Sequence, residues 1–147
     1  MKKILVYLCV ALPMIFTACE KNDGGNDTIN TIVGTWGNTG SLPKEVSVTG
    51  NDNLKMKIVD ELTATYGNGH TFTFHENGNV TLDGENYATY TLNGKTILFS
   101  GTHSYSSEFS VVSDILTIYD DVTKDYADAY PNDVINKVIV ARMYAKK

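Results

Sequence analysis

The stretch "TFTFHENGNVTLDGENYATYTLNGKTILFSG", residues 71–101, decides the fold. Successive side chains of a strand point to opposite faces, so apolar residues two positions apart predict a strand with one buried face. Asn-Gly or Asp-Gly separates these strands at 77–78, 83–84 and 93–94, and such dipeptides tolerate the positive φ angles of tight hairpin turns. The sequence therefore predicts consecutive antiparallel strands. Their buried residues are Phe72 and Phe74, Val80 and Leu82, Tyr90 and Leu92, and Ile97 and Phe99.

The same period of two extends to both sides of this stretch. Phe109 and Val111 precede a turn at 113–114, Leu116 and Ile118 follow it, and a longer run covers 134–145. With an opening strand at 32–38, the pattern predicts about eight strands. Closing such a sheet removes both of its unpaired edges. We therefore expect a mainly β protein whose residues 32–147 form a single eight-stranded antiparallel up-and-down barrel.

One segment has a different period. In "NDNLKMKIVDELTATYGNG", residues 51–69, apolar side chains recur every four positions, which is typical of one face of a helix. Asp52 or Asn53 is the expected N-cap, and Gly67 the expected end. A strand is the alternative, since residues 54, 56 and 58 also alternate, but the apolar residues at 59 and 62 favour one helix after the first strand.

The chain begins with a basic, then apolar, leader. Met1, Lys2 and Lys3 precede thirteen largely apolar residues, 4–16, which are too few to cross about 30 Å of hydrocarbon as a stable helix. The following "FTAC", residues 16–19, resembles the lipobox of bacterial lipoproteins. This resemblance implies that residues 1–18 are a signal peptide and that Cys19 is lipidated. Cys9 would leave with the leader, so Cys19 would have no disulfide partner. A plain secretory signal with an incidental cysteine is the alternative.

Residues 19–31 read as a disordered polar tether, because they contain too little apolar surface to fold. The acidic residues after Cys19 resemble an export signal for the outer face of the outer membrane, although any soluble linker is polar. "DTI", residues 27–29, resembles an O-glycosylation sequon that would modify Thr28. We expect an outer-membrane lipoprotein of the cell envelope, possibly exposed on the cell surface, that contacts the membrane through its lipid alone.

The charge of the mature chain excludes two classes of partner. Removing residues 1–18, with their two lysines, leaves 129 residues of formal charge −7. An acidic chain repels phosphate backbones and anionic headgroups, so we expect no nucleic-acid binding and no basic membrane patch. We expect a monomer.

"VGTW", residues 33–36, resembles the Gly-x-Trp that begins the first strand of lipocalins. It follows the tether and precedes a single helix and a hairpin meander, as in small bacterial lipocalin-like lipoproteins. The resemblance covers residues 32–145, and the helix leaves the family within this group open. It implies that an arginine late in the barrel, here Arg142, packs over Trp36 in a cation–π contact; an exposed Arg142 is the alternative.

No catalytic or metal-binding pattern stands out. His70 and His75 are five apart and would point to opposite faces of a strand, and His103 is isolated, so we expect no metal. The acidic run at 119–133, with Asp120, Asp121, Asp125 and Asp128, matches no calcium loop and is expected to be a solvated connection. No Gly-x-Ser-x-Gly occurs, and the mature thiol is expected to be blocked. We expect no cofactor and no enzyme activity.

Two functions remain open. In the first, the barrel binds a small apolar or amphipathic ligand, which the sequence does not identify, through aromatic residues at its open end. The candidates are Tyr66, Phe72, Phe74, Tyr87, Tyr90, Tyr105 and Phe109. In the second, a filled structural barrel presents its outer surface to an envelope protein or a glycan. The expected inward residues are bulky, which favours a narrow or closed cavity.

Overall fold

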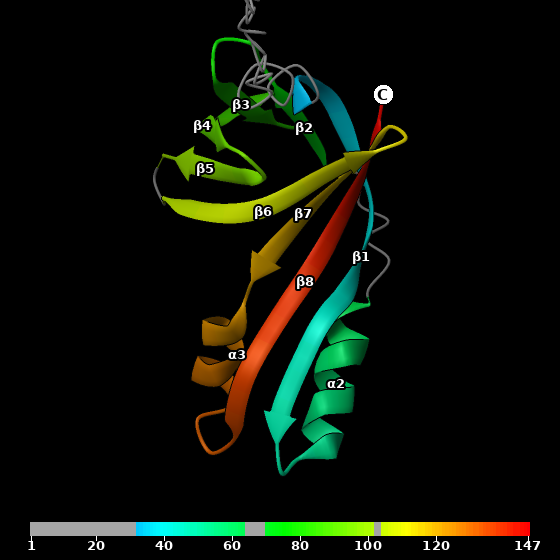
Figure 1. Cartoon of the computed structure of the whole chain (residues 1–147), viewed down its shortest axis with the longest axis vertical. Helices are drawn as coiled ribbons and strands as arrows, with labels where there is room; N and C mark the ends of the chain where they lie inside the picture. The colour runs from blue at the N-terminus through cyan, green and yellow to red at the C-terminus, as the bar shows by residue number, and fades with distance from the viewer. Residues whose placement is uncertain (1–31, 64–69, 102–103) are drawn as a thin grey trace, which may run out of the picture.

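The computed structural model describes residues 32–63, 70–101 and 104–147 and consists of a closed barrel with two helices (Figure 1). The strands follow one another in chain order, each antiparallel to the next, and β1 also pairs with β8. The predicted eight-stranded up-and-down barrel is confirmed. Its elements are β1 (Gly34–Thr49), α2 (Asp52–Leu62), β2 (Thr71–Phe74), β3 (Asn79–Leu82), β4 (Glu85–Asn93), β5 (Thr96–Ser100), β6 (Tyr105–Val112), β7 (Ile115–Asp121), α3 (Thr123–Ala129) and β8 (Val134–Lys146).

The hairpin turns lie at the positions that the sequence predicts. Between β3 and β4, Asp83 and Gly84 have φ angles of 53° and 88°. Between β6 and β7, Ser113 and Asp114 have φ angles of 49° and 61°. Two successive left-handed residues match the right-handed twist of the flanking strands. The Asx-containing turns thus fix the register of the barrel.

Strand β1 is much longer than the predicted 32–38. It pairs with β8 along its length, with register shifts between Asn38 and Gly40, Pro43 and Glu45, and Ser47 and Val48. Each shift interrupts the alternation of side chains, so the sequence beyond residue 38 has no visible period of two. The lower parts of β1 and β8 continue beyond the other strands as a two-stranded ribbon (Figure 1).

Helix α2 follows the first strand, as predicted, but its ends differ. The N-cap is Asn51, one residue before the expected caps, and its side chain accepts a hydrogen bond from the Leu54 backbone N–H at 3.0 Å. The helix ends at Leu62, earlier than predicted. The expected end at Gly67 and the candidate Tyr66 lie outside the described residues.

A second helix, α3, was not predicted. It occupies part of the acidic run that we expected to be a solvated connection, and it has no buried residue. Its start is held by Asp121, whose carboxylate accepts hydrogen bonds from the Thr123 backbone N–H at 3.1 Å and from the Thr123 hydroxyl. Within the described residues, no helix is long and apolar enough to cross a membrane.

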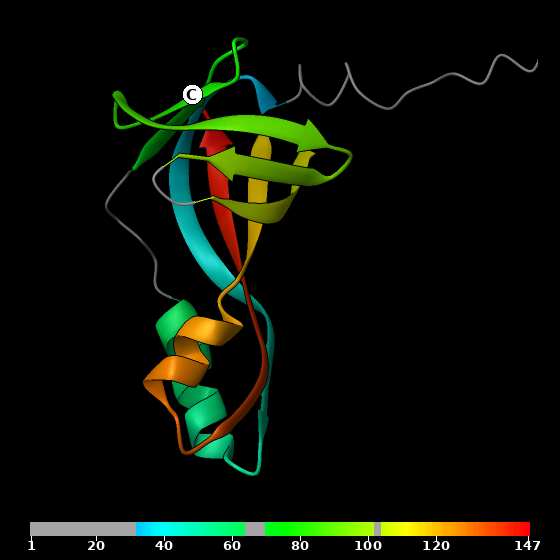
Figure 2. The same ribbon diagram turned by 90° about the vertical axis from the view of Figure 1, so that its left-hand side faces the viewer.

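The two helices lie below the barrel against the β1–β8 ribbon, forming a helix lobe (Figure 2). Each part has its own apolar core. The barrel core contains Ile32, which precedes β1, and buried residues from every strand: Trp36, Phe74, Val80, Tyr90, Ile97, Phe99, Phe109, Leu116, Ile118 and Tyr144. The helix-lobe core consists of Leu54, Ile58, Leu62, Val138 and Val140. β1 and β8 therefore connect two packed regions.

Candidate functional site

The upper end of the barrel is closed by Trp36. Its indole is completely buried and donates its N–H to the Ile32 carbonyl at 2.7 Å. Trp36 lies opposite Lys146 in the β1–β8 ladder, and the Lys146 ammonium lies 5.6 Å from the indole ring. This end of the barrel is plugged by side chains.

The expected contact between Arg142 and Trp36 is wrong. The first and last strands do pair, but Arg142 lies opposite Ser41, five residues along β1 from Trp36. Its Nε instead lies 3.0 Å from the Asp120 carboxylate, and its side chain is 46% exposed. The register of two irregular strands thus places a lysine where the resemblance predicted an arginine.

Aromatic side chains fill much of the barrel interior. Phe74 packs edge-on against Tyr90 with ring centroids 5.1 Å apart, and Phe109 is buried. The Tyr90 hydroxyl donates to the His75 carbonyl at 3.1 Å, near the β2–β3 turn. Three of the predicted ligand-binding residues, Phe74, Tyr90 and Phe109, are therefore core residues, and Tyr90 does not line the open end.

Two other candidates, Tyr87 and Tyr105, meet at the lower end of the barrel. Their hydroxyls lie 3.0 Å apart, and each residue is 40% exposed. A register shift in β4 after its pairing with Val80 explains how Tyr87 reaches the interior, where its ring packs edge-on against Phe72. The opposite edge of Phe72 contacts Tyr144 with centroids 5.5 Å apart. We call this lower end of the barrel, with Phe72, Tyr87, Tyr105 and Tyr144, the mouth.

A charged pair lies at the same mouth. Asp120 of β7 is in contact with Arg142 of β8 and accepts a hydrogen bond from the Ser107 hydroxyl of β6 at 2.5 Å. The Ser107 residue is buried, so this carboxylate is held from two sides. The mouth therefore combines apolar ring surface with one fixed ion pair.

The electrostatics link these groups into one cluster. Burial raises the pKa of Tyr105, and the nearby Tyr87, Asp120 and Tyr144 raise it further. Burial also raises the pKa of Tyr144, while Arg142 and a hydrogen bond from the Asn38 side chain oppose the rise. Both phenols stay protonated at neutral pH and act as hydrogen-bonding groups. We call Asn38, Tyr87, Tyr105, Ser107, Asp120, Arg142 and Tyr144 the mouth cluster.

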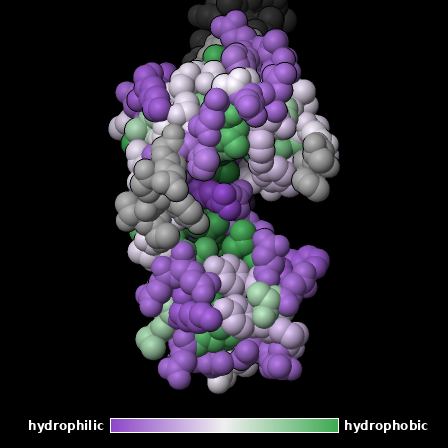
Figure 3. Space-filling view, turned by 180° about the vertical axis from the view of Figure 1, so that it is seen from behind, coloured by the Kyte–Doolittle hydropathy of each residue, from purple (hydrophilic) through white to green (hydrophobic). Residues whose placement is uncertain are grey.

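A hollow of about 170 Å³ lies between the mouth and the helix lobe. Arg142 and Ser41 line its barrel side, while Leu62 and Tyr126 come from the helix side. Ser41 also donates its hydroxyl to the Leu62 carbonyl at 2.8 Å, which ties the end of α2 to β1. Figure 3 shows that the surface narrows between barrel and lobe, with hydrophilic and hydrophobic residues together there.

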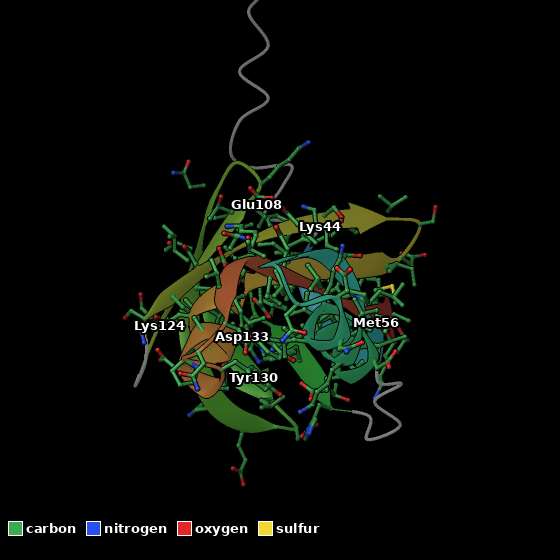
Figure 4. All side chains as sticks on the ribbon, turned by 90° about the horizontal axis from the view of Figure 1, so that it is seen from below. Lys44, Met56, Glu108, Lys124, Tyr130 and Asp133 are labelled. Atoms are coloured by element: carbon green, nitrogen blue, oxygen red, sulfur yellow. The ribbon has the colours of Figure 1, made fainter. Side chains whose placement is uncertain are left out.

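A larger groove of about 460 Å³ crosses the outer face of the barrel. Lys44 lies 4.0 Å from the centre of the Tyr119 ring and 3.8 Å from Glu108, so it bridges β1 to β7 and β6. Lys137 and Asp121 form a second ion pair in the groove. Figure 4 shows Lys44 and Glu108 next to each other, on the side away from Tyr130 and Asp133.

The two histidines that the structure describes lie at the two ends of β2. His70 lies just before β2 and pairs with Asp83 at 2.6 Å, and His75 lies after β2, 3.4 Å from the Thr81 hydroxyl. His103 lies outside the described residues. In the part of the chain that the structure describes, no three His, Cys, Asp or Glu residues are grouped as metal ligands would be.

Most of the mouth cluster was not predicted from the sequence. Asp120 was noted only as part of an acidic run, and Arg142 was assigned to the wrong contact. Their alternation with the buried Ile118 and Val140 is the signal that could have identified both as inward-facing residues. Tyr144 is four residues from Val140, so the same alternation places it on the inner face of β8. The bulge that turns Tyr87 inward has no such signal.

The resemblance to lipocalins stays a prediction, since the structure shows the closed eight-stranded barrel and no more. Lipidation of Cys19 and glycosylation of Thr28 stay predictions, because both residues lie outside the described ranges. Comparison with protein-family models, with curated proteins and with solved structures finds no match to this chain.

Proposed function

We propose that this chain is a lipid-anchored envelope protein that binds a small amphipathic molecule at the mouth of its barrel, without catalysing a reaction. The supporting observation is that three tyrosines and the Asp120–Arg142 pair gather at one end of an otherwise apolar interior, beside a hollow. Aromatic rings with polar tips suit a molecule that is neither fully apolar nor fully charged.

The size of the hollow limits what enters it. About 170 Å³ is the share of roughly six water molecules. Deeper entry is opposed by Phe72, Phe74 and Tyr90, which pack against one another or their neighbours inside the barrel. The ligand therefore places one end in the mouth and leaves the rest between barrel and helix lobe or in solvent.

Binding is favoured over catalysis by the chemistry of the mouth. The phenols of Tyr105 and Tyr144 have raised pKa values, so neither is a nucleophile or a general base at neutral pH. The Asp120 carboxylate is engaged by Ser107 and Arg142. These groups orient a polar head by hydrogen bonds.

The anchor would direct the mouth outward. The described chain begins at Ile32, at the plugged end of the barrel, and the helix lobe lies at the opposite end (Figure 2). An acyl chain on Cys19 would hold the plugged end toward the membrane. Mass spectrometry of protein from its own cells should find diacylglycerol on an N-terminal Cys19; an unmodified chain that still contains Cys9 would contradict the anchor.

Native mass spectrometry of the same material tests the binding. A co-purifying small molecule should be lost when Tyr87 and Tyr105 are both replaced by Ala. The matched control is Tyr119→Ala, which alters a tyrosine on the outer face, in the groove. Retention of the molecule by the double variant, or no binding of any amphiphile by the intact protein, would contradict the proposal.

The outer groove supports a second candidate function, contact with an envelope glycan or protein. Its larger volume, its two ion pairs and the Tyr119 ring offer a polar surface to such a partner. Replacing both Lys44 and Glu108 by Ala should abolish capture of purified envelope polysaccharide or of a candidate envelope protein, while the Tyr87 and Tyr105 variant should not. The reverse pattern would exclude the groove.

A further inference from the structure

We propose that the head group read by the mouth is uncharged and hydroxyl-bearing, as in an alkyl glycoside or a monoacylglycerol. This inference rests on the proposed function and names the class of ligand for the same site. It starts from Asn38, whose side-chain oxygen Oδ1 is buried and has no hydrogen-bond partner in the structure's described residues.

Asn38 belongs to the mouth cluster through Tyr144. Asn38 and Tyr144 lie opposite each other in the β1–β8 ladder, and the Asn38 side chain acts to lower the pKa of the Tyr144 phenol. Tyr144 in turn interacts with Tyr87, Asp120 and Arg142. Buried amide oxygens are rarely left unpaired, because losing water without a replacement is costly. Turning the amide by 180° would only exchange an unpaired acceptor for an unpaired donor, so this part of the cluster needs a polar partner in either orientation.

Two exposed tyrosines lie near Tyr144, the residue opposite Asn38. Tyr87 and Tyr105 are each 40% exposed and are joined by their hydroxyls, whereas Tyr144 is almost completely buried. Exposed side chains change rotamer quickly. A ligand hydroxyl that replaces the Tyr87–Tyr105 hydrogen bond would meet donors and acceptors on both sides.

The charged side chains near the mouth decide which kind of ligand head group can bind there. Asp120 and Arg142 neutralise each other, and Asp125 adds a carboxylate to the lining of the hollow. A carboxylate or phosphate head would face Asp120 and Asp125. An ammonium head beside Asn38 would be repelled by the Arg142 guanidinium, and the Asp120 carboxylate is already engaged by Arg142 and Ser107.

A hydroxyl head provides the partner that the Asn38 side-chain oxygen lacks among the described residues, and it carries no charge. It donates to an acceptor such as Asn38 Oδ1 and accepts from a phenol or guanidinium, with no net charge to desolvate. One satisfied hydrogen bond in place of an unsatisfied group corresponds to about a tenfold gain in affinity. The ligand's apolar part would lie against Leu62 and Val140 in the hollow.

The test uses three photoactivatable probes with the same octyl chain and a glucose, carboxylate or trimethylammonium head. The full chain is held in lipid nanodiscs, and labelled residues and half-saturating concentrations are read by mass spectrometry. The glucoside should label the mouth at a concentration about tenfold lower than either charged probe. Tyr144→Phe and, independently, Asn38→Ala should reduce this advantage to less than about threefold. The matched control Tyr119→Phe, which removes an outer-face hydroxyl, should leave the preference for the glucoside unchanged.

The outcomes separate the two proposals. Equal labelling of the mouth by all three probes, or stronger labelling by a charged probe, would overturn the hydroxyl head and leave amphiphile binding standing. Absence of mouth labelling by every probe would overturn both. Because the comparison of heads is made on the unaltered protein, it holds even where a variant fails to fold.

Discussion

The Trp36 side chain combines three interactions at the plugged end of the barrel. Its ring is completely buried, its N–H is bonded to Ile32, and the Lys146 ammonium lies over it. Lys146 is an exposed residue, so its cation–π contact contributes about 0.5 to 1 kcal/mol. The burial and the hydrogen bond therefore contribute more to stability than the cation does.

Replacing Trp36 by Phe should lower the free energy of unfolding by about 1 to 3 kcal/mol, because it leaves a small cavity and an unpaired carbonyl. Lys146→Met should cost less than about 1 kcal/mol. Urea denaturation followed by circular dichroism measures both changes.

Trp36 is the only tryptophan in the chain, so its fluorescence reports on its neighbours directly. Lys146→Met should shift the emission, and Arg142→Met should not, because Arg142 is paired with Asp120. An equal shift in the two variants would show that the guanidinium does reach the indole.

At the scale of single elements, the short helix α3 depends on Asp121. This carboxylate accepts two hydrogen bonds from Thr123 and pairs with Lys137 of β8. The hydrogen bond from Lys137, followed by those from Thr123, lowers the pKa of Asp121 from 3.8 to about 2. The folded state therefore favours the ionised carboxylate more than the unfolded chain does.

Asp121→Ala should lower the free energy of unfolding at pH 7 by about 0.5 to 1.5 kcal/mol, because it removes the hydrogen bonds from Thr123 and the ion pair with Lys137. A lowered folded-state pKa gives stabilisation that is complete above about pH 4 and disappears as the pH falls toward 2. The gap between the parent and the variant should therefore shrink over that interval. Denaturant unfolding at several pH values measures it, and a gap independent of pH would contradict the account. Asp128→Ala, which removes an exposed pair with Lys124, is the control and should cost little.

The elements that the sequence predicts are those with a regular period. Alternating apolar residues identify β2 to β7, and Asx-Gly turns separate the strands from β2 to β5. The alternation is interrupted in β4, at the bulge that contains Tyr87. Helix α3 has no buried residue, so it leaves no apolar pattern to detect. Strand β1 contains Pro43 and three register shifts, which conceal its alternation.

The candidate site was predictable only in part, because bulges change which residues of neighbouring strands come together. Tyr87 and Tyr105, which we expected at one end of the barrel, are in contact there, whereas the hydroxyl of Tyr90, expected with them, faces the other end. Along a regular strand, the residues on one face are all odd-numbered or all even-numbered. This alternation identifies the inward side chains but does not tell which end of the barrel they occupy. Long-range register, which bulges alter, decides that.

At the scale of the whole molecule, two apolar cores share two continuous strands. The barrel core and the helix-lobe core are joined through β1 and β8, and Val138 and Val140 of β8 belong to the second core. Unfolding the helix lobe would expose Val138 and Val140 and leave the β1–β8 ribbon without the helices that pack against it. We therefore expect the two regions to unfold together.

Ile58→Ala in α2 and Ile97→Ala in β5 test this coupling, since both side chains are completely buried. Each should cost about 2 to 5 kcal/mol. In both variants, Trp36 fluorescence and far-ultraviolet circular dichroism should report one shared transition. Loss of the helical signal before the Trp36 signal in Ile58→Ala would show that the lobe unfolds independently.

The hydrogen bond from the Lys147 backbone N–H to the Thr35 carbonyl, 2.9 Å long, holds the two ends of the barrel domain side by side. A few linker residues between Lys147 and Ile32 would therefore make the domain circular, and the exposed turn at Ser113–Asp114 offers a place to reopen it. Such a permuted chain would start at β7 and end at β6 while keeping every other neighbouring pair connected as before. The barrel is in this sense a closed ring of antiparallel strands with no intrinsic first strand.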